Sequence, residues 1–369
     1  MPTVPGVSVT SFACVLVALL AELTSAADQL TLTSPLPHQV IQRTGVAPGE
    51  GQADVAIAGE LPVNAGVFTW SYRVVPAGGK VDANTGWQPA TVVRNGQSFH
   101  GSVKLDAGGW YRLELRGEND DKFVAQAAVE PIGVGEVFVI AGQSYATNTN
   151  EERHNVQDRQ RRVVAYDART KTWRVAYDPQ PTPDGSDGGS IWPPLGDALA
   201  AQLQVPIGFA NVAWGGTSSQ QWMPGDQLHQ RLVETGRELK RFRAVLWQQG
   251  ESDVIGQTTV DQYVANLVEI RTRAADAWGF EPCWLLAKST HHPTVYNDPD
   301  GEGRIRTAID RLIELPGFCA GPDTDALKGE NRGDINSRRH FSTIGQRRAA
   351  EMWRDAILET VLSEKPEAR

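Results

Sequence analysis

The sequence predicts an α/β domain with about five parallel strands, preceded by a small all-β domain. Short strand-like runs separated by turn residues occupy positions from about 28 to about 130, whereas strands alternate with helices from Gly135 onward. The first pattern is typical of a β-sandwich and the second of a mostly parallel sheet covered by helices. We therefore predict a leader over residues 1–26, a β-sandwich over 27–131 and a three-layer α/β domain over 132–369.

Composition narrows the function classes. The chain has 369 residues and a formal net charge of -9, which argues against a nucleic-acid partner because a phosphate backbone requires a basic face. The spacing of the cysteines does not indicate a metal site. Cys283 and Cys319 each lie in a strand-like run, so they either pair, if those strands are neighbours, or stay as buried thiols.

The first 26 residues have the pattern of a secretory signal. An apolar core runs from Phe12 to Leu20, and Thr24-Ser25-Ala26 supplies the small residues that a signal peptidase needs, although no Lys or Arg precedes the core. The apolar run is too short to span a bilayer. We expect a secreted or periplasmic protein without a membrane span.

The first domain contains turns but no pattern of catalytic residues. Strand-like runs begin at Val40, Val55 and Phe68, and Gly109 to Arg116 alternates like a strand with one buried face. Paired carboxylates, histidine clusters and phosphate-binding loops are absent from this sequence. Its role is therefore packing or contact with carbohydrate, and the sequence does not choose between them.

The second domain alternates strands with helices. We predict strands at 137–141, 205–213, 244–248, 283–287 and 318–320, and helices at 195–203, 228–240, 260–278, 303–315 and from about Ser342 onward. The connection from Asn150 to Ile191 is long and rich in Gly and Asp. Connections of that length are usually functional rims or lids.

Polar clusters follow the predicted strands. Ser144 follows the first strand, Trp214-Gly-Gly-Thr-Ser-Ser219 the second and Gln249-Gly-Glu-Ser-Asp253 the third, while His340 precedes the last helix. Carboxyl ends of parallel strands share one edge, so these groups can converge on a nucleophile, oxyanion donors and a base. Alone, Ser144 is equally well explained as the cap of a following helix.

The four blocks resemble those of the SGNH (GDSL-type) hydrolases, and more narrowly the sialate O-acetylesterase branch of carbohydrate acetylesterases. They are Gly142-Gln-Ser144, Trp214-Gly-Gly-Thr-Ser218, Trp247-Gln-Gln-Gly-Glu-Ser-Asp253 and Asp334…His340-Phe-Ser. The resemblance covers roughly residues 135 to 358. It implies a flavodoxin-like domain and a serine esterase that removes O-acetyl groups from carbohydrates without a metal or organic cofactor.

The same resemblance implies a role for individual residues. Ser144 is the nucleophile, and its own N–H is one oxyanion donor. Gly216 matches the second donor, and Gln249 stands where a side-chain amide donor is expected. Each such donor typically contributes about 3 kcal/mol of transition-state stabilisation. His340 is the general base and acid.

The acid of the triad departs from the family pattern. Relatives place an aspartate three residues before the histidine, where this chain has Ser337, whereas Asp334 lies six residues before His340. We predict Asp334 as the acid that orients the imidazole. Asp325 and Glu251 are its rivals, and Glu251 alternatively supports the loop of the third block.

Sugar contacts and rival functions stay open. Trp214, Trp222 and Trp247 lie in or near the blocks and are candidates for stacking on sugar rings, while Arg338 and Arg339 either attract an acidic sugar or are solvated. The expected partner is an acetylated carbohydrate, and the sequence does not give the sugar or the oligomeric state. A short-chain lipase or thioesterase, and a carbohydrate-binding protein with a decayed site, are the alternatives.

Overall fold

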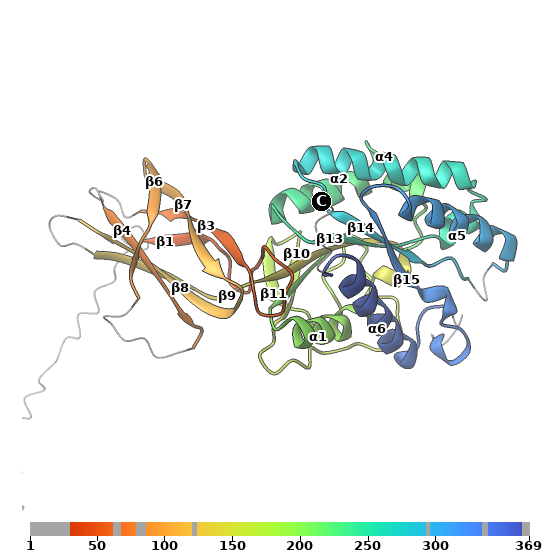
Figure 1. The fold of residues 1–369 in the computed structure, drawn as a ribbon, viewed down its shortest axis with the longest axis horizontal. Coiled ribbons are helices and arrows are strands. Elements are labelled where there is room, and N and C mark those ends of the chain that lie inside the picture. The colour runs from red at the N-terminus through yellow and green to blue at the C-terminus, as the bar shows by residue number, and fades with distance from the viewer. Residues whose placement is uncertain are drawn as a thin grey trace, which may run out of the picture.

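The structure, a computed structural model, describes residues 30–61, 68–78, 86–119, 124–292, 296–333 and 339–363. It has two parts along its long axis, with β-sheets at one end and helices around a sheet at the other (Figure 1). The leader predicted over residues 1–26 lies outside the described residues. Within them, no helix has the length and apolar character that crossing a membrane requires.

The secondary structure follows the predicted succession of elements. The first part contains β1 (Thr31–Ser34), β2 (Val40–Gln42), β3 (Gln52–Glu60), β4 (Thr69–Pro76), β5 (Gln88–Pro89), β6 (Thr91–Asn95), β7 (Ser98–Asp106) and β8 (Gly108–Glu118). The long strand β9 (Val124–Gly142) leads to β10 (Val163–Asp167), β11 (Thr172–Val175), α1 (Trp192–Leu203), β12 (Ile207–Asn211), α2 (Gln227–Leu239), β13 (Ala244–Gln248), α3 (Glu251–Ile255), α4 (Val260–Trp278), β14 (Cys283–Lys288), α5 (Pro299–Ile313), β15 (Phe318–Asp323) and α6 (Thr343–Thr360). The bounds of β13 and α4 agree with the predicted ones.

The first part consists of two sheets over one core. One sheet has the order β1-β3-β7-β6, and the other joins β4, β5 and β8 to β9. Val55 and Val103 of the first sheet pack with Leu113 and Leu115 of the second in a single hydrophobic cluster. The predicted domain boundary between residues 131 and 132 falls inside β9, which continues unbroken into the second part.

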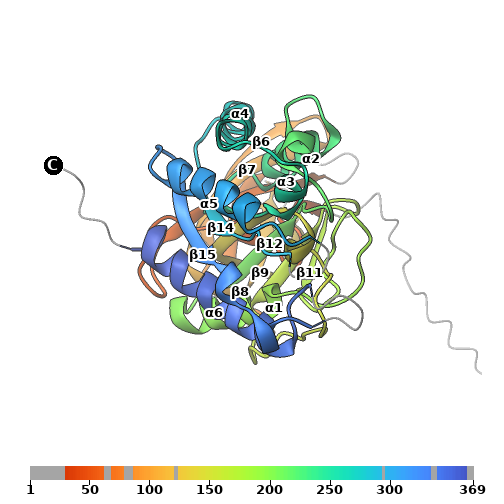
Figure 2. The same cartoon turned by 90° about the vertical axis from the view of Figure 1, so that its right-hand side faces the viewer.

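The second part has a parallel sheet between two layers of helices. Its order is β11-β10-β12-β9-β13-β14-β15, and every pair is parallel except β10 with β11. Helices α1 and α6 cover one face, and α2, α4 and α5 cover the other (Figure 2). The described sheet thus has six parallel strands where the sequence predicts about five. The additional strand, β10, lies in the connection that the sequence predicts as a loop.

A buried ion cluster joins the two parts. Glu136, within β9, binds Arg43 through Oε1 and Arg243 through Oε2, each at 2.7 Å, and neither Glu136 nor Arg43 has an exposed side chain. Arg43 also donates to the carbonyls of Ala47 and Glu50.

Cys283 of β14 and Cys319 of the neighbouring strand β15 form a disulfide. Of the two alternatives that the sequence left open for these cysteines, the structure therefore has the paired one.

Candidate active site

Ser144 lies in the turn that follows β9. Gly142 has φ +133°, and a Cβ there would lie 2.1 Å from the carbonyl oxygen of Gln248, so this close approach of β9 to β13 requires glycine. Gln143 donates its N–H to the same carbonyl at 3.0 Å. Ser144 then begins a single 3-10 turn whose N-cap is Gln143, without a side-chain cap. The side chain of Ser144 is partly exposed and does not cap a helix.

Gly216 lies in the loop that follows β12, beside the end of β9. The N–H of Trp214 donates to the carbonyl of Gly142 at 3.0 Å and fixes this loop against the Ser144 turn. Gly216 is exposed and has φ +72°, the left-handed region that favours glycine. No hydrogen bond among the described residues engages the N–H of Gly216 or of Ser144. Both are therefore available to a ligand oxygen.

Gln249 sits in a buried polar network behind that loop. Its Nε2 lies 3.2 Å from Gln143 Oε1, 3.1 Å from the carbonyl of Thr217 and 2.6 Å from Asp253 Oδ2. Its Oε1 accepts a hydrogen bond from the Tyr263 hydroxyl at 2.9 Å. The amide thus connects the first three sequence blocks to one another. To donate to a substrate oxygen it must release one of these acceptors.

His340 is buried and lies against the Ser144 turn. Its ring contacts the ring of Tyr145 edge to face, with centroids 5.2 Å apart. The next residue, Phe341, donates its N–H to Asn150 Oδ1 at 3.1 Å, and its carbonyl accepts the N–H of Glu151 at 3.2 Å. The segment before α6 is therefore anchored to the segment that follows Ser144. The structure brings the predicted nucleophile and base to the same edge of the sheet.

Tyr145 holds the other side of the histidine segment. Its hydroxyl donates to the carbonyl of Arg339 and accepts from the guanidinium of Arg332. Burial raises the pKa of Tyr145 above its usual range, so the phenol stays protonated and can keep donating. The sequence gives Tyr145 no role, since an aromatic residue after a nucleophile is indistinguishable from a core residue.

The candidate acids have different surroundings. Asp334 lies outside the described residues. The carboxylate of Asp325 accepts from the N–H and hydroxyl of Thr290 at 2.8 and 2.7 Å, from the N–H of His291 at 2.9 Å, and pairs with Arg306 at 2.9 Å. Both oxygens of Asp325 thus hold the loop that follows β14.

Glu251 is a buried carboxyl at the first position of α3. Its Oε1 accepts from the Ser289 hydroxyl at 2.9 Å, and its Oε2 has no hydrogen-bond partner in the described part of the chain. Burial, with a smaller contribution from the charge of Asp325, raises the pKa of Glu251 to about 8. Glu251 is therefore protonated at neutral pH, and the contact it makes is with the end of β14.

Two further polar residues organise the site, although the sequence predicts no role for either of them. Asp253 is fully buried and accepts from the N–H and hydroxyl of Ser219, both at 2.7 Å. Asn148 binds the carbonyl of Gln180 and the hydroxyl of Thr182, both at 2.9 Å, and so fixes the connection before α1. Asp253 belongs to the third block, and Asn148 lies four residues after Ser144. These positions in the sequence were the signal that could have identified them.

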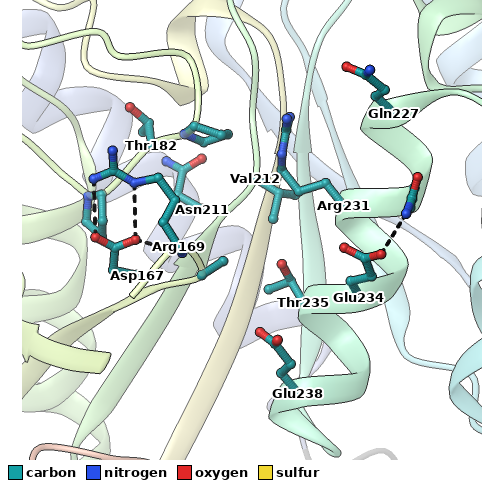
Figure 3. A pocket seen from close by; sticks show the side chains of 14 residues that line it. Asp167, Arg169, Thr182, Asn211, Val212, Gln227, Arg231, Glu234, Thr235 and Glu238 are labelled. Carbon is teal, nitrogen blue, oxygen red and sulfur yellow. Dashed lines mark hydrogen bonds and ion pairs between the residues drawn. The ribbon is translucent and has the colours of Figure 1, made fainter. Parts of the chain in front are cut away.

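Only one of the three suspected tryptophans is accessible. Trp222 and Trp247 are fully buried and pack edge to face at 5.2 Å, so they belong to the core and cannot stack on a sugar. Trp214 is 36% exposed. A cavity of about 360 Å³ lies close to it, between α2 and the end of β12, with Arg231 and Glu234 projecting from the helix (Figure 3).

Comparison with known proteins supplies the family. The protein-family model described as "Carbohydrate esterase, sialic acid-specific acetylesterase" matches residues 134–359, more than half of the chain. A probable carbohydrate esterase of Arabidopsis thaliana is 37% identical over 65 residues, which are 16% of this chain and 25% of that relative. A solved carbohydrate acetylesterase from Xanthomonas citri is 14% identical, with a TM-score of 0.55 over 91% of this chain and 76% of that chain. A solved Arabidopsis thaliana protein is 20% identical, covering 61% of this chain and 98% of its own, with a TM-score of 0.49.

The family model confirms the resemblance to the sialate O-acetylesterase branch that the four blocks indicate. The likeness to the Xanthomonas citri structure shows a shared mixed α/β fold, and it extends over most of the chain.

Proposed function

Because the chain belongs to the carbohydrate esterases described as sialic acid-specific acetylesterases, we propose that it deacetylates carbohydrates through an acyl-serine intermediate. Ser144 Oγ attacks the acetyl carbonyl carbon while His340 takes the hydroxyl proton. The C–O bond to the sugar then breaks, and His340 returns the proton to the leaving sugar oxygen. Water, activated by the same imidazole, attacks the acyl-serine and releases acetate.

One observation supports this mechanism above the others. The Ser144 turn, Gly216 and His340 come from three separate parts of the chain and meet at one edge of the sheet. The N–H groups of Ser144 and Gly216 can then stabilise the oxyanion, each by about 3 kcal/mol. Gln249 is the proposed third donor, with Asp253 and Thr217 as the contacts that it loosens when substrate binds.

The deciding experiment compares the wild-type protein with Ser144→Ala on 4-nitrophenyl acetate. We expect kcat to fall at least about a thousand-fold, because the oxyanion donors alone leave only a residual rate. The unfolding free energy should stay within about 0.5 kcal/mol, since the side chain is partly exposed. A variant that keeps near-full activity would exclude Ser144 as the nucleophile.

For the acid we propose Asp334, which orients the imidazole. The support is indirect: Asp325 already has four donors, and Glu251 is protonated at neutral pH and bonded to Ser289. Asp334→Asn should lower kcat by about two to four orders of magnitude with little change in stability. Asp325→Asn should mainly lower stability, because Arg306 and the Thr290 loop lose their charged acceptor. The reverse ranking of activities would move the acid to Asp325.

We also propose that the protein is exported, to the periplasm or outside the cell. The composition of residues 1–26 supports this, as does the Cys283–Cys319 disulfide, because disulfides persist mainly in oxidising compartments.

A further inference from the structure

The surface beside Gly216 contains a second, open pocket. It measures about 420 Å³ and is bordered by the loop after β12 and the first turns of α2. Its lining includes Trp214, Gln220, Gln221, Asp226, Gln227 and Arg231. Because Gly216 lies between Trp214 and Thr217 in the chain, a group bound at the N–H of Gly216 has this pocket as its neighbour.

Trp214 has the exposure of a binding platform. Among the chain's 11 tryptophans, all of them described, it is the most exposed; Trp87, Trp110 and Trp278 are partly exposed and the other seven are buried. The guanidinium of Arg231 lies over its ring, 4.9 Å from the centroid, and holds the ring in place. The backbone of Trp214 is fixed as well, since its N–H donates to Gly142 and its carbonyl accepts from Thr217. An exposed aromatic ring on a rigid backbone suits the apolar face of a sugar ring.

The charges around this pocket favour an uncharged ligand. Its lining holds one acidic and one basic side chain, Asp226 and Arg231. The Nη1 atom of Arg231 is buried without a hydrogen-bond partner in the described ranges, so the edge formed by Nη1 and Nη2 is not open to a carboxylate. The neighbouring cavity, which shares Gln227 and Arg231 with this pocket, adds the carboxylates of Asp167, Glu234 and Glu238 and the guanidinium of Arg169 (Figure 3).

Amide side chains complete the lining. Gln220, Gln221 and Gln227 offer both donors and acceptors, which is what the hydroxyl groups of a sugar require. Gln221 is already bonded through Oε1 to the N–H of Ser218 at 2.9 Å, which fixes the 3-10 turn that carries Gln220. We propose that the pocket beside Trp214 is a subsite for an uncharged sugar ring of the acetylated substrate, with Trp214 as its stacking platform.

This inference rests on the proposed esterase activity and is tested separately from it. The substrates are 4-nitrophenyl acetate, an O-acetylated neutral oligosaccharide such as acetylated xylotriose, and an O-acetylated sialic acid. In Trp214→Ala we expect the ratio of kcat/KM for the oligosaccharide to that for the aryl acetate to fall at least tenfold, mainly through KM. Trp214→Phe, which keeps an aromatic ring, should recover part of the loss.

The controls separate the possible failures. Leu315→Ala, which removes another exposed apolar side chain far from the pocket, should leave the ratio unchanged. An unchanged ratio in Trp214→Ala would overturn the subsite, and a larger loss on the sialic acid ester than on the neutral ester would overturn its neutral character. 4-Nitrophenyl octanoate is measured as a fourth substrate, and a loss confined to it would overturn the subsite by showing that the pocket holds an acyl chain instead. Failure of the esterase proposal itself would appear as no Ser144-dependent acetate release from any substrate.

Discussion

The two halves of β9 have the same backbone conformation but different surroundings. In the first half, which pairs with the antiparallel strand β8, buried and exposed positions are mixed, with Ala125 and Val129 buried and Gln126 and Ala128 exposed. From Ile132 to Gly142 every residue is buried: Ile132 and Val134 still belong to the core of the first part, whereas Val137 to Ala141 are buried because helices cover both faces of the parallel sheet. An antiparallel sheet can leave one face to water, whereas a parallel sheet normally cannot.

This difference explains where the site is. A strand covered on both faces can present functional groups to solvent only at its ends, so Ser144 lies just past the carboxyl end of β9. The strand also connects this end directly to the first part of the molecule. We infer that the first part supports the position of the Ser144 turn through β9 and through the ion cluster around Glu136.

The substitution Glu136→Ala should have the largest effect on stability, and it tests whether the two halves of β9 depend on each other. The change leaves the guanidinium groups of Arg43 and Arg243 without their shared carboxylate, and Arg43 is fully buried. Removing one partner of a buried ion pair typically costs about 3–5 kcal/mol. We expect a loss of this size in the unfolding free energy from urea denaturation, with both halves of β9 losing protection in hydrogen exchange.

The matched control for this prediction is Glu269→Ala. Glu269 forms an ion pair with Arg273 one helical turn away in α4, with side chains that are 41% and 58% exposed. Such pairs contribute about 0.3–0.5 kcal/mol. Equal losses in the two variants would contradict the view that the junction is a buried structural element. Loss of protection in the first half of β9 alone would contradict the coupling between the parts.

The central strands of the helix-covered parallel sheet are predicted better from the sequence than the strand at its edge and the directions of individual side chains. Runs such as Val137 to Ala141 and Ala244 to Trp247 are uniformly apolar and followed by glycine or a polar residue, so the carboxyl ends of their strands are clear, although β9 begins at Val124, well before the predicted start at 137. The first three polar blocks sit where strands end and His340 directly precedes the last helix, which predicts the convergence of Ser144, Gly216 and His340. These features depend on local composition, which a single sequence displays.

The direction in which a side chain points cannot be predicted from local composition. The amide of Gln249 turns inward to Asp253, and Trp222 and Trp247 turn into the core, although Trp214 in the same surroundings turns outward. The strand β10 is missed because its run Val163-Val-Ala-Tyr-Asp167 lies within a Gly- and Asp-rich connection. Pairing with β12 stabilises it, and that contact is not local in sequence.

The smallest expected effect concerns Glu251 at the carboxyl end of the covered sheet. Its pKa of about 8 in the folded protein lies above the usual 4.5, so the folded state binds the proton more tightly than the unfolded state does. The stability that this proton provides is complete below about pH 4.5 and is lost as pH rises through 8. The wild-type protein should therefore lose stability across this window. Glu251→Gln should not show this loss, because an amide does not ionise.

We expect the two proteins to differ by less than about 1 kcal/mol at pH 5, where the amide oxygen keeps the hydrogen bond from Ser289. At pH 9 the variant should be more stable by about 2 kcal/mol or more, since the wild-type carboxylate is then charged in a buried position. Urea denaturation of both proteins at a series of pH values measures this difference, and titrations elsewhere in the chain cancel in the comparison. Parallel stability curves would mean that Glu251 ionises in the folded protein near its ordinary pKa, and that the end of β13 is open to water in a way that the rest of the sheet is not.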